Sequence, residues 1–357
     1  MNNRWRGVAD RLVQGLGVQP GELVEVRDGT GDLELLVEIQ LAVERAGATP
    51  QVLLLPADYL QRLWSEVAPE YLARWDEHRA GNLRQAHRVL RLLGAGADPA
   101  RAPADALQAW MGARHRLTEI EEERRLPFLL VVIPTARAAE QLGLSAEQYE
   151  AILLPALEAS AEVLQAEIER VLAAVRGGQQ ITIHSGEGCV LHLEHGERPW
   201  LSDDGVIDTA DRARGAIVSN LPAGSIYTTV LEERAHGCLW LPRAGEAEGV
   251  TLHFRGGRVE RIDAQRGAEA LAAMFDGHSG EPRRVSHVGI GLNPFLKQPV
   301  GDIIVDEHIH GCLFIAFGEN RYMGGQNESS LNVDFVHPGA TLEVDGRVIV
   351  SQGKLVA

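Results

Sequence analysis

The chain has 357 residues, and its length and composition already exclude several classes of protein. Its 45% of hydrophobic residues, with 38 glycines and 16 prolines, is typical of a folded mixed protein and not of a disordered one. The length exceeds one ordinary hydrophobic core, so we expect two domains. The net charge of -16, with arginines interleaved among acids, argues against a nucleic-acid partner, because phosphate binding needs clustered Lys and Arg.

The N-terminal segment MNNRWRGVADRL has no apolar signal core, and no stretch approaches the ~20 apolar residues of a membrane helix. We therefore expect a cytoplasmic protein without membrane contacts. The three cysteines, Cys189, Cys238 and Cys312, are widely spaced and form no CxxC pair. This spacing predicts neither a disulfide framework nor a zinc site, and each cysteine is expected to fill core volume.

The first part of the chain predicts a βαβ opening. Residues 22–28 form a short strand, residues 32–47 an amphipathic helix with Asp32 at its N-cap, and residues 50–56 a second buried strand. The GTGD segment before the helix lacks the GxGxxG pattern of a dinucleotide site.

The next stretch, residues 59–125, is predicted to be helical and charged, with a loop at 94–103 rich in Ala, Gly and Pro. A third buried strand follows at 128–134, and two helices then lead to Gly177. Residues 1–176 are therefore predicted to form an α/β domain with a central parallel sheet.

After Gly177 the sequence changes to short alternating strands separated by glycine turns. This pattern predicts an antiparallel β-rich domain over residues 177–357. One helix is expected at 267–280, and a terminal hairpin around Asp345 and Gly346.

The most informative part of the second domain is the stretch 285–336, which contains three strand-like segments with isolated polar residues. In VSHVGIG, His287 stands among valines and is followed by Gly289 and Gly291, which we expect to allow tight turns. A continuous apolar run at 312–317 predicts a second buried strand.

In the third segment, LNVDF, apolar residues alternate with Asn332 and Asp334, which places both polar side chains on one face of a strand. A histidine in an apolar strand, such as His287, is commonly a hydrogen-bonded core residue. A carboxylate in such surroundings is costly to bury unless it is paired or bound to a metal. We therefore predict that His287 and Asp334 belong to one site.

Several motifs of the chain have the same order as in a known family. The segments PTARAAEQLGLSAEQYE, DDGVID, NLPAGSIY, GIGLNP, DEHIHGCLFIAFGEN and GGQN occur in the order and spacing of the thermophilic aminopeptidases. The chain thus resembles the aminopeptidase T and PepS type metallopeptidases. The resemblance implies a homodimer in which an α/β domain precedes a β-rich domain with a two-metal site, acting on a small molecule or short peptide.

The metal ligands of that family fall on Ser225, His287, Phe314, Asn332 and Asp334 of this chain. Only the carboxylate is retained in kind, because serine and phenylalanine cannot replace anionic or imidazole ligands. We therefore expect Ser225 and Phe314 to line a substrate pocket.

The segment SHVGIG also resembles 2,5-dihydroxypyridine dioxygenase, which shares this fold and holds one non-haem iron by a His in an SHxGxG segment and a His-x-Asp pair. The resemblance implies that His287 and Asp334 bind one divalent metal, iron(II) in preference to zinc or cobalt. Asn332 stands where the second histidine is expected, and His236 or His310 is the candidate replacement. The alternative is that His308 and His310 are exposed loop residues and that His236 is not a ligand, and the site could hold no metal.

Tyr322 follows the apolar strand and could donate a proton to a leaving group or hold a substrate oxygen. Three functions remain open. They are a one-metal enzyme that oxygenates or hydrolyses a small aromatic or amino-acid-derived substrate, a non-catalytic peptide or small-molecule binding protein, and an aminopeptidase with an altered metal set.

Overall fold

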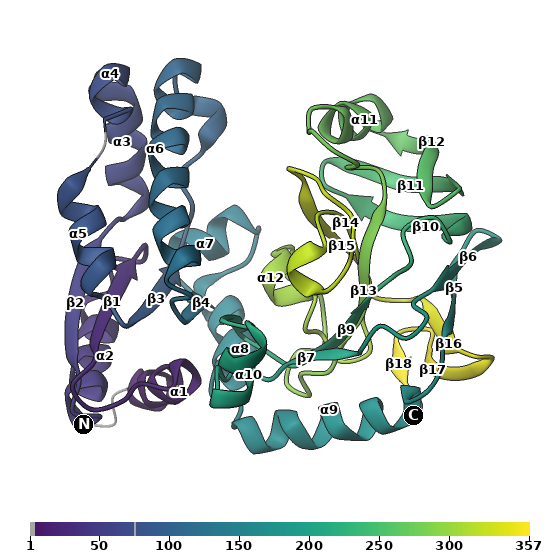
Figure 1. The fold of residues 1–357 in the computed structure, drawn as a ribbon, viewed down its shortest axis with the longest axis horizontal. Coiled ribbons are helices and arrows are strands. Elements are labelled where there is room, and N and C mark those ends of the chain that lie inside the picture. Colours follow the sequence, from purple (N-terminus) through teal and green to yellow (C-terminus); the bar gives the residue numbers. More distant parts are fainter. Residues whose placement is uncertain (1–3, 75) are drawn as a thin grey trace. The chain divides into compact units, whose positions relative to one another are not determined.

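The computed structural model describes residues 4–74 and 76–357 and divides the chain into two compact units. The first unit extends to Ala161 and also includes the segment Gly205–Pro222. The second consists of Glu162–Asp204 and Ala223–Ala357. Figure 1 labels their helices and strands.

The first unit is built on a five-stranded sheet in the order β2-β1-β3-β4-β8, in which every neighbouring pair is parallel. Its strands are β1 (Leu23–Asp28), β2 (Thr49–Leu54), β3 (Arg88–Leu93), β4 (Phe128–Val132) and β8 (Val218–Leu221). The predicted α/β architecture with a central parallel sheet is therefore present.

The helices of this unit pack in two groups. One group contains α1 (Arg6–Leu16), α2 (Leu33–Arg45), α7 (Ala136–Gln141), α8 (Ala146–Leu157) and α10 (Thr209–Arg214). The other contains α3 (Ala57–Glu66), α4 (Pro69–Leu72), α5 (Glu77–Gln85), the short η1 (Pro99–Arg101) and α6 (Ala104–Glu123). Asp32 caps α2 by accepting from the Leu35 backbone, and Ser145 with Gln148 forms the capping box that starts α8.

The central strand β3 lies within the stretch 59–125 that the sequence predicted to be helical. Its residues RVLRLL are buried except for one arginine, with Leu93 only partly covered. A short apolar run of this kind fits a buried helix as well as a parallel strand, because both are covered on all sides. Strand β8 also differs from the prediction, because the chain returns to the first sheet after residue 176, where the first domain was predicted to end.

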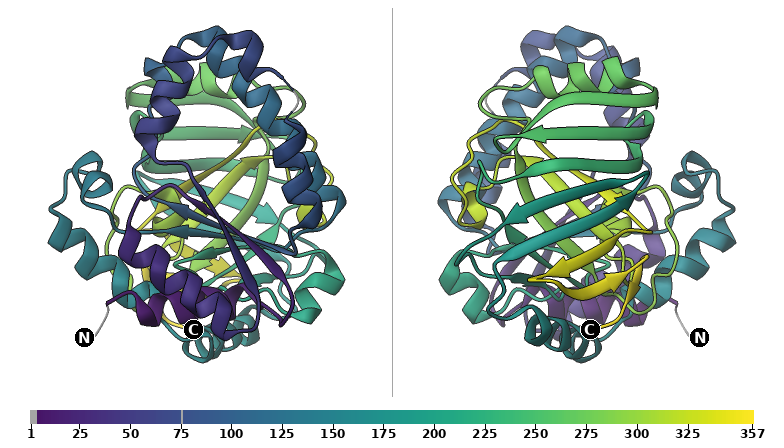
Figure 2. Two further views of the ribbon diagram at one scale, coloured as in Figure 1. Left: turned by 90° about the vertical axis from the view of Figure 1, so that its left-hand side faces the viewer. Right: turned by 90° about the vertical axis from the view of Figure 1, so that its right-hand side faces the viewer.

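The second unit contains two antiparallel sheets, as the glycine-separated strands predicted. The first has the order β12-β11-β10-β6-β5-β16-β17-β18 and runs from green through teal to yellow in the right-hand view of Figure 2. Its strands are β5 (Gln180–Gly186), β6 (Cys189–Glu194), β10 (His236–Ala244), β11 (Ala247–Arg255), β12 (Arg258–Arg266), β16 (Thr341–Val344), β17 (Arg347–Ser351) and β18 (Lys354–Leu355).

The other sheet has the order β15-β14-β13-β9-β7. Its strands are β7 (Leu201–Asp203), β9 (Ser225–Thr229), β13 (Val285–Gly291), β14 (Leu313–Gly318) and β15 (Asn332–His337). The helices are α9 (Ala161–Val175), α11 (Ala268–Asp276), α12 (Ile303–Asp306) and the short η2 (Arg321–Met323). The predicted strands at 285–291, 312–317 and 331–335 are thus neighbours in one sheet.

A single hydrophobic core lies between the two sheets of the second unit, and both contribute residues to it. Phe317 on β14 is fully buried there, with its ring centroid 5.4 Å from that of Phe275 and 5.8 Å from that of Phe335. Buried residues of α9 join the same core, which explains why this helix belongs to the second unit although it precedes the predicted boundary.

The prediction that the cysteines form no disulfide is wrong for two of them. Cys189 on β6 and Cys238 on β10 form a disulfide between adjacent strands, with their Cα atoms 5.1 Å apart. They are 49 residues apart in sequence, so only the strand order brings them together. Cys312 is free and buried, and burial raises the pKa of its thiol to about 12. Among the helices of the described residues, none is long and apolar enough to cross a membrane.

We expect Phe317→Ala to lower the free energy of unfolding by about 3–5 kcal/mol, because it leaves a cavity where three aromatic rings meet. Denaturant unfolding would measure this change. Val348→Ala, at a residue that is 39% exposed, is the control and should change stability by less than about 1 kcal/mol. Equal effects of the two substitutions would contradict the placement of the core.

Candidate functional site

The candidate site lies on the sheet β15-β14-β13-β9-β7 of the second unit, on the face that points away from the core. Along β14, Ile315 and Phe317 belong to the core cluster, whereas Phe314 and Ala316 alternate onto the opposite face. The strand register aligns Ala316 with Asp334 on β15, and His287 with Thr229 on β9. Strands β9, β13, β14 and β15 together carry the site (Figure 1).

A β-bulge in β13 directs His287 toward Asp334. Val285 pairs with Phe317 and Val288 with Ile315, so Ser286 and His287 together face the single residue Ala316. Ala316 has a small side chain, and it leaves room for the two polar side chains to meet above it. His287 Nε2 lies 3.2 Å from Asp334 Oδ1.

The contact between His287 and Asp334 lacks hydrogen-bond geometry, and Asp334 Oδ1 is buried without a hydrogen-bond partner among the described residues. On the other side of the ring, Ser286 Oγ donates to the Glu319 carbonyl and lies 3.0 Å from His287 Nδ1. In the neutral imidazole Ser286 therefore accepts from Nδ1–H, and the lone pair of Nε2 faces the carboxylate oxygen. Two electron-rich atoms in this position are well suited to share a cation.

Aromatic rings surround the imidazole of His287. The Tyr227 centroid lies 5.6 Å from that of His287, and the Phe314 centroid lies 5.9 Å away. Gly289 is required here because a Cβ atom would collide with the Phe314 ring, and Gly291 because a Cβ atom would collide with backbone carbonyls of residues 307–309. Both glycines lie inside β13, so they give space to neighbours and do not form the expected tight turns.

Tyr322 and Asn332 lie beside Asp334. The Asn332 side-chain amide donates to the Tyr322 hydroxyl at 3.2 Å. Although 65% of Tyr322 is exposed, the pKa of its hydroxyl is raised to about 12, first by desolvation and then by the charge of Asp334. The phenol therefore remains protonated at neutral pH.

A further carboxyl group close to the site was not singled out from the sequence. Glu307 follows α12, its side chain is 15% exposed, and its pKa is raised well above the usual range. Burial is the largest cause, followed by the charges of Asp334, Asp203 and Asp302. The neighbouring His308 is buried as well, and burial lowers its pKa to about 4, so the expectation that His308 is an exposed loop residue is wrong.

The structure does not bring the proposed replacement ligands to the His287–Asp334 pair. His236 lies in the other sheet, where it is stacked on His192 at a centroid distance of 5.0 Å. His310 lies 3.6 Å from Glu167 on α9. Within the described part of the chain, no group of three His, Cys, Asp or Glu residues is arranged to hold a metal ion.

Ser225 is buried at the start of β9, and Tyr227 and Thr229 share its face of the strand. It pairs with Gly291, four residues along β13 from His287. Tyr227, Ser286 and Glu307 lie near the site and were not singled out from the sequence. The alternation in SIYTT would have placed Tyr227 on the same face as Ser225.

More than half of the chain, residues 146–357, matches the family model described as "NicX: 2,5-dihydroxypyridine 5,6-dioxygenase". The chain belongs to this family. The match covers all the strands that carry the site.

Aminopeptidase T of Thermus aquaticus is 30% identical over 149 residues, which is 36% of this chain and 36% of that protein. The match thus spans about a third of this curated relative. Wild-type AmpT from Thermus thermophilus has the same fold, with a TM-score of 0.78 and 19% identity over 99% of both chains.

The structure of 2,5-dihydroxypyridine dioxygenase from Pseudomonas putida KT2440 is also similar, with a TM-score of 0.64 and 16% identity, covering 99% of this chain and 97% of that one. The expected resemblance to aminopeptidase T and to the dioxygenase is confirmed. So is the predicted combination of a parallel α/β part with antiparallel sheets.

We expect Glu307→Gln to raise the melting temperature of the metal-free protein at pH 7–8. A carboxyl whose pKa is raised on folding destabilises the folded state once the pH exceeds its unfolded value of about 4.3, and glutamine removes this effect. The gain should shrink as the pH falls toward 5. Thermal unfolding at several pH values would measure it, with the 79%-exposed Glu233 changed to Gln as the control. A gain independent of pH would contradict the assignment.

Proposed function

We propose that this chain is a metal-dependent enzyme in which His287 and Asp334 hold one divalent metal, iron(II), and that it oxygenates a small hydroxylated aromatic substrate. The observation that carries the proposal is the buried Asp334 Oδ1, which faces His287 Nε2 at 3.2 Å without a hydrogen bond. A buried carboxylate oxygen without a partner is costly, and a bound cation would offset that cost.

The charges around the pair also favour a cation. After burial, the charges of Asp334, Asp203 and Asp302 raise the pKa of Glu307, so these carboxyl groups lie close enough to one another to interact. An imidazole with a carboxylate is part of the ligand set of non-haem iron oxygenases. The family match points in the same direction.

The small number of protein ligands bears on the substrate. A site with only one imidazole and one carboxylate leaves several coordination positions open, and a hydroxylated aromatic compound carries oxygen donors of its own. The partly buried ring of Tyr227 beside His287 offers a surface against which a planar ring can pack. When bound, the metal would activate such a substrate and molecular oxygen toward each other.

Residues of the chain itself would orient the substrate and its protons. Ser286 fixes the His287 ring through Nδ1, which keeps Nε2 available as a ligand. Asn332 donates to the Tyr322 oxygen, so the Tyr322 proton is free to be donated to a substrate oxygen. With its pKa raised to about 12, the Tyr322 hydroxyl stays protonated, so it is suited to donating a hydrogen bond to a substrate oxygen.

One observation favours a second candidate, a binding protein without a metal. The described residues supply no third His, Cys, Asp or Glu to the pair, and Phe314 occupies a position where the aminopeptidase resemblance places a histidine ligand. In that case the residues around His287 would bind a small molecule or peptide without catalysing a reaction.

Metal content separates the two candidates. Protein purified anaerobically without chelator and supplied with iron(II) should contain about one metal ion per chain, and His287→Ala and Asp334→Ala should each lose it. Elemental analysis would measure the metal. His236→Ala and Asp263→Ala, at a histidine and an aspartate in the other sheet, are the matched controls and should retain it. Unchanged metal in either site variant would disprove the assignment, and protein that takes up no metal would favour the binding protein.

Tyr322→Phe should leave the metal content unchanged and lower oxygen consumption with 2,5-dihydroxypyridine and related dihydroxy aromatics by at least about tenfold, since it removes a hydrogen bond that orients the substrate oxygen. An oxygen electrode would follow the reaction. Tyr71→Phe, at a tyrosine that is 62% exposed, is the control. If iron-loaded protein consumes no oxygen with these compounds but hydrolyses aminoacyl chromogenic substrates, the result would contradict oxygenation and indicate a peptidase.

A further inference from the structure

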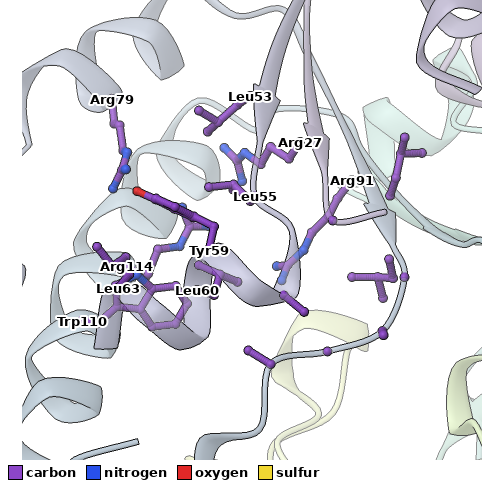
Figure 3. A pocket seen from close by; sticks show the side chains of 18 residues that line it. Arg27, Leu53, Leu55, Tyr59, Leu60, Leu63, Arg79, Arg91, Trp110 and Arg114 are labelled. Atoms are coloured by element: carbon purple, nitrogen blue, oxygen red, sulfur yellow. The ribbon is translucent and has the colours of Figure 1, made fainter. Parts of the chain in front are cut away.

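A cavity of about 140 Å³ lies within the first unit, apart from the site described above. It is lined by the ends of β1, β2 and β3 and by side chains from α3, α5 and α6 (Figure 3). Four arginines reach it, Arg27, Arg79, Arg91 and Arg114. Such a concentration is unexpected in a chain with a net charge of -16.

The strand register places two of these arginines side by side. Arg27 on β1 pairs with Arg91 on β3, and on its other side with Leu53 on β2. All three side chains therefore point to the same face of the sheet. Like charges on adjacent strands repel each other unless something neutralises them.

Carboxylates of the chain neutralise only part of this charge. Arg27 pairs with Glu25 through Nε and with Glu121 through Nη2, both at 2.6 Å, but its Nη1 is buried without a partner. Arg27 itself is only 3% exposed. Neither Arg91 nor Arg114 forms an ion pair with a carboxylate of the described residues.

The pKa values of the cavity arginines reflect their burial and the nearby positive charge, with Glu121 acting in the opposite direction. The pKa of Arg114 is lowered to about 10, first by desolvation and then by Arg27. Arg91 is exposed toward the cavity, and its pKa is lowered by the same two causes in the same order. All these guanidinium groups remain protonated at neutral pH, so they form an electropositive cavity wall.

The position of the cavity in the sheet gives a second, independent reason to expect a ligand. In the order β2-β1-β3-β4-β8, strand β2 is added on one side of β1, whereas β3 and the strands after it are added on the other side. Ligands of open parallel sheets bind at the carboxyl ends of the strands beside such a switch point. Gly29 after β1 and residues 92–97 at the end of β3 line the cavity there.

The backbone at this edge is not available to an anion. Asp28 accepts hydrogen bonds from the backbone N–H groups of Thr30 and Gly31, which would otherwise be free at the start of α2. A negatively charged ligand would therefore be held by arginine side chains. Arginine is suited to this because its planar fork matches carboxylate and phosphate oxygens.

Apolar side chains form the rest of the wall. They include Leu55, Leu60, Leu63 and Trp110, with Tyr59 beside them (Figure 3). The volume is close to that of an engineered cavity of about 150 Å³ that accepts benzene in another protein. The cavity thus has room for roughly one ring next to its charged wall.

We propose that this cavity binds a small organic oxyanion, a carboxylate or phosphate monoester carried on an apolar body about the size of one ring. Arg91 and Arg114 hold the oxyanion, and the charge of the buried Arg27 adds to the attraction. Trp110 and the leucines contact the apolar body.

Titration calorimetry with benzoate, phenyl phosphate, inorganic phosphate and benzylamine would test this. Benzoate or phenyl phosphate should bind, the better of the two identifying the oxyanion, and inorganic phosphate should bind more weakly because it lacks the ring. Benzylamine, which carries the ring with a positive charge, should not bind. Arg91→Gln and Arg114→Gln should each weaken binding at least tenfold.

Arg62→Gln is the matched control, because Arg62 lies on α3 in the same unit with its side chain 73% exposed. It should leave affinity unchanged. Thermal unfolding without ligand adds a second readout, since Arg91→Gln should keep or raise the melting temperature by removing repulsion from Arg27. Absence of binding by both aromatic anions, or equal binding by Arg91→Gln and Arg62→Gln, would overturn the proposal. Because the site metal plays no part in these measurements, the outcome is independent of the function proposed above.

Discussion

The meeting of His287 and Asp334 across β14 is the constraint on which the candidate site depends. These residues belong to strands that are not neighbours, and they meet because a bulge in β13 redirects the histidine over the small Ala316. The result is that His287 Nε2 and a buried oxygen of Asp334 lie 3.2 Å apart without a hydrogen bond between them. A buried carboxylate oxygen without a hydrogen bond is costly, and a bound cation would offset that cost.

The same sheet separates stability from chemistry by its two faces. Ile315 and Phe317 project into the core, where aromatic rings pack around Phe317. Phe314 and Ala316 project to the other side and shape the space around His287. Because side chains alternate along a strand, one rigid element supplies both functions, and the site inherits the rigidity of the core.

Each unit also contains an excess of one kind of charge in a confined place. In the second unit burial, and after it the charges of Asp334, Asp203 and Asp302, raise the pKa of Glu307. In the first unit burial, and after it the charge of Arg27, lowers the pKa of Arg114, with Glu121 acting in the opposite direction. Unbalanced charge inside a folded protein is costly, and ligands of the opposite charge are the usual reason that it persists.

The sequence by itself determined much of the secondary structure and the strongest site residues. Alternation in LNVDF and the apolar surroundings of His287 are local patterns, and they correctly placed both residues on strands of one sheet. The capping residues Asp32 and Ser145 were readable for the same reason, since caps act within one turn. Motif order was sufficient to indicate the family.

Tertiary structure alone decided which distant segments meet. The sequence could not distinguish β3 from a buried helix, because a parallel strand covered on both faces has no alternation. It could not pair Cys189 with Cys238, place His236 in a different sheet from His287, or align Arg27 with Arg91, since each depends on strand order and register. Periodicity records how a segment faces its surroundings, whereas only the folded sheet determines which segment lies beside it.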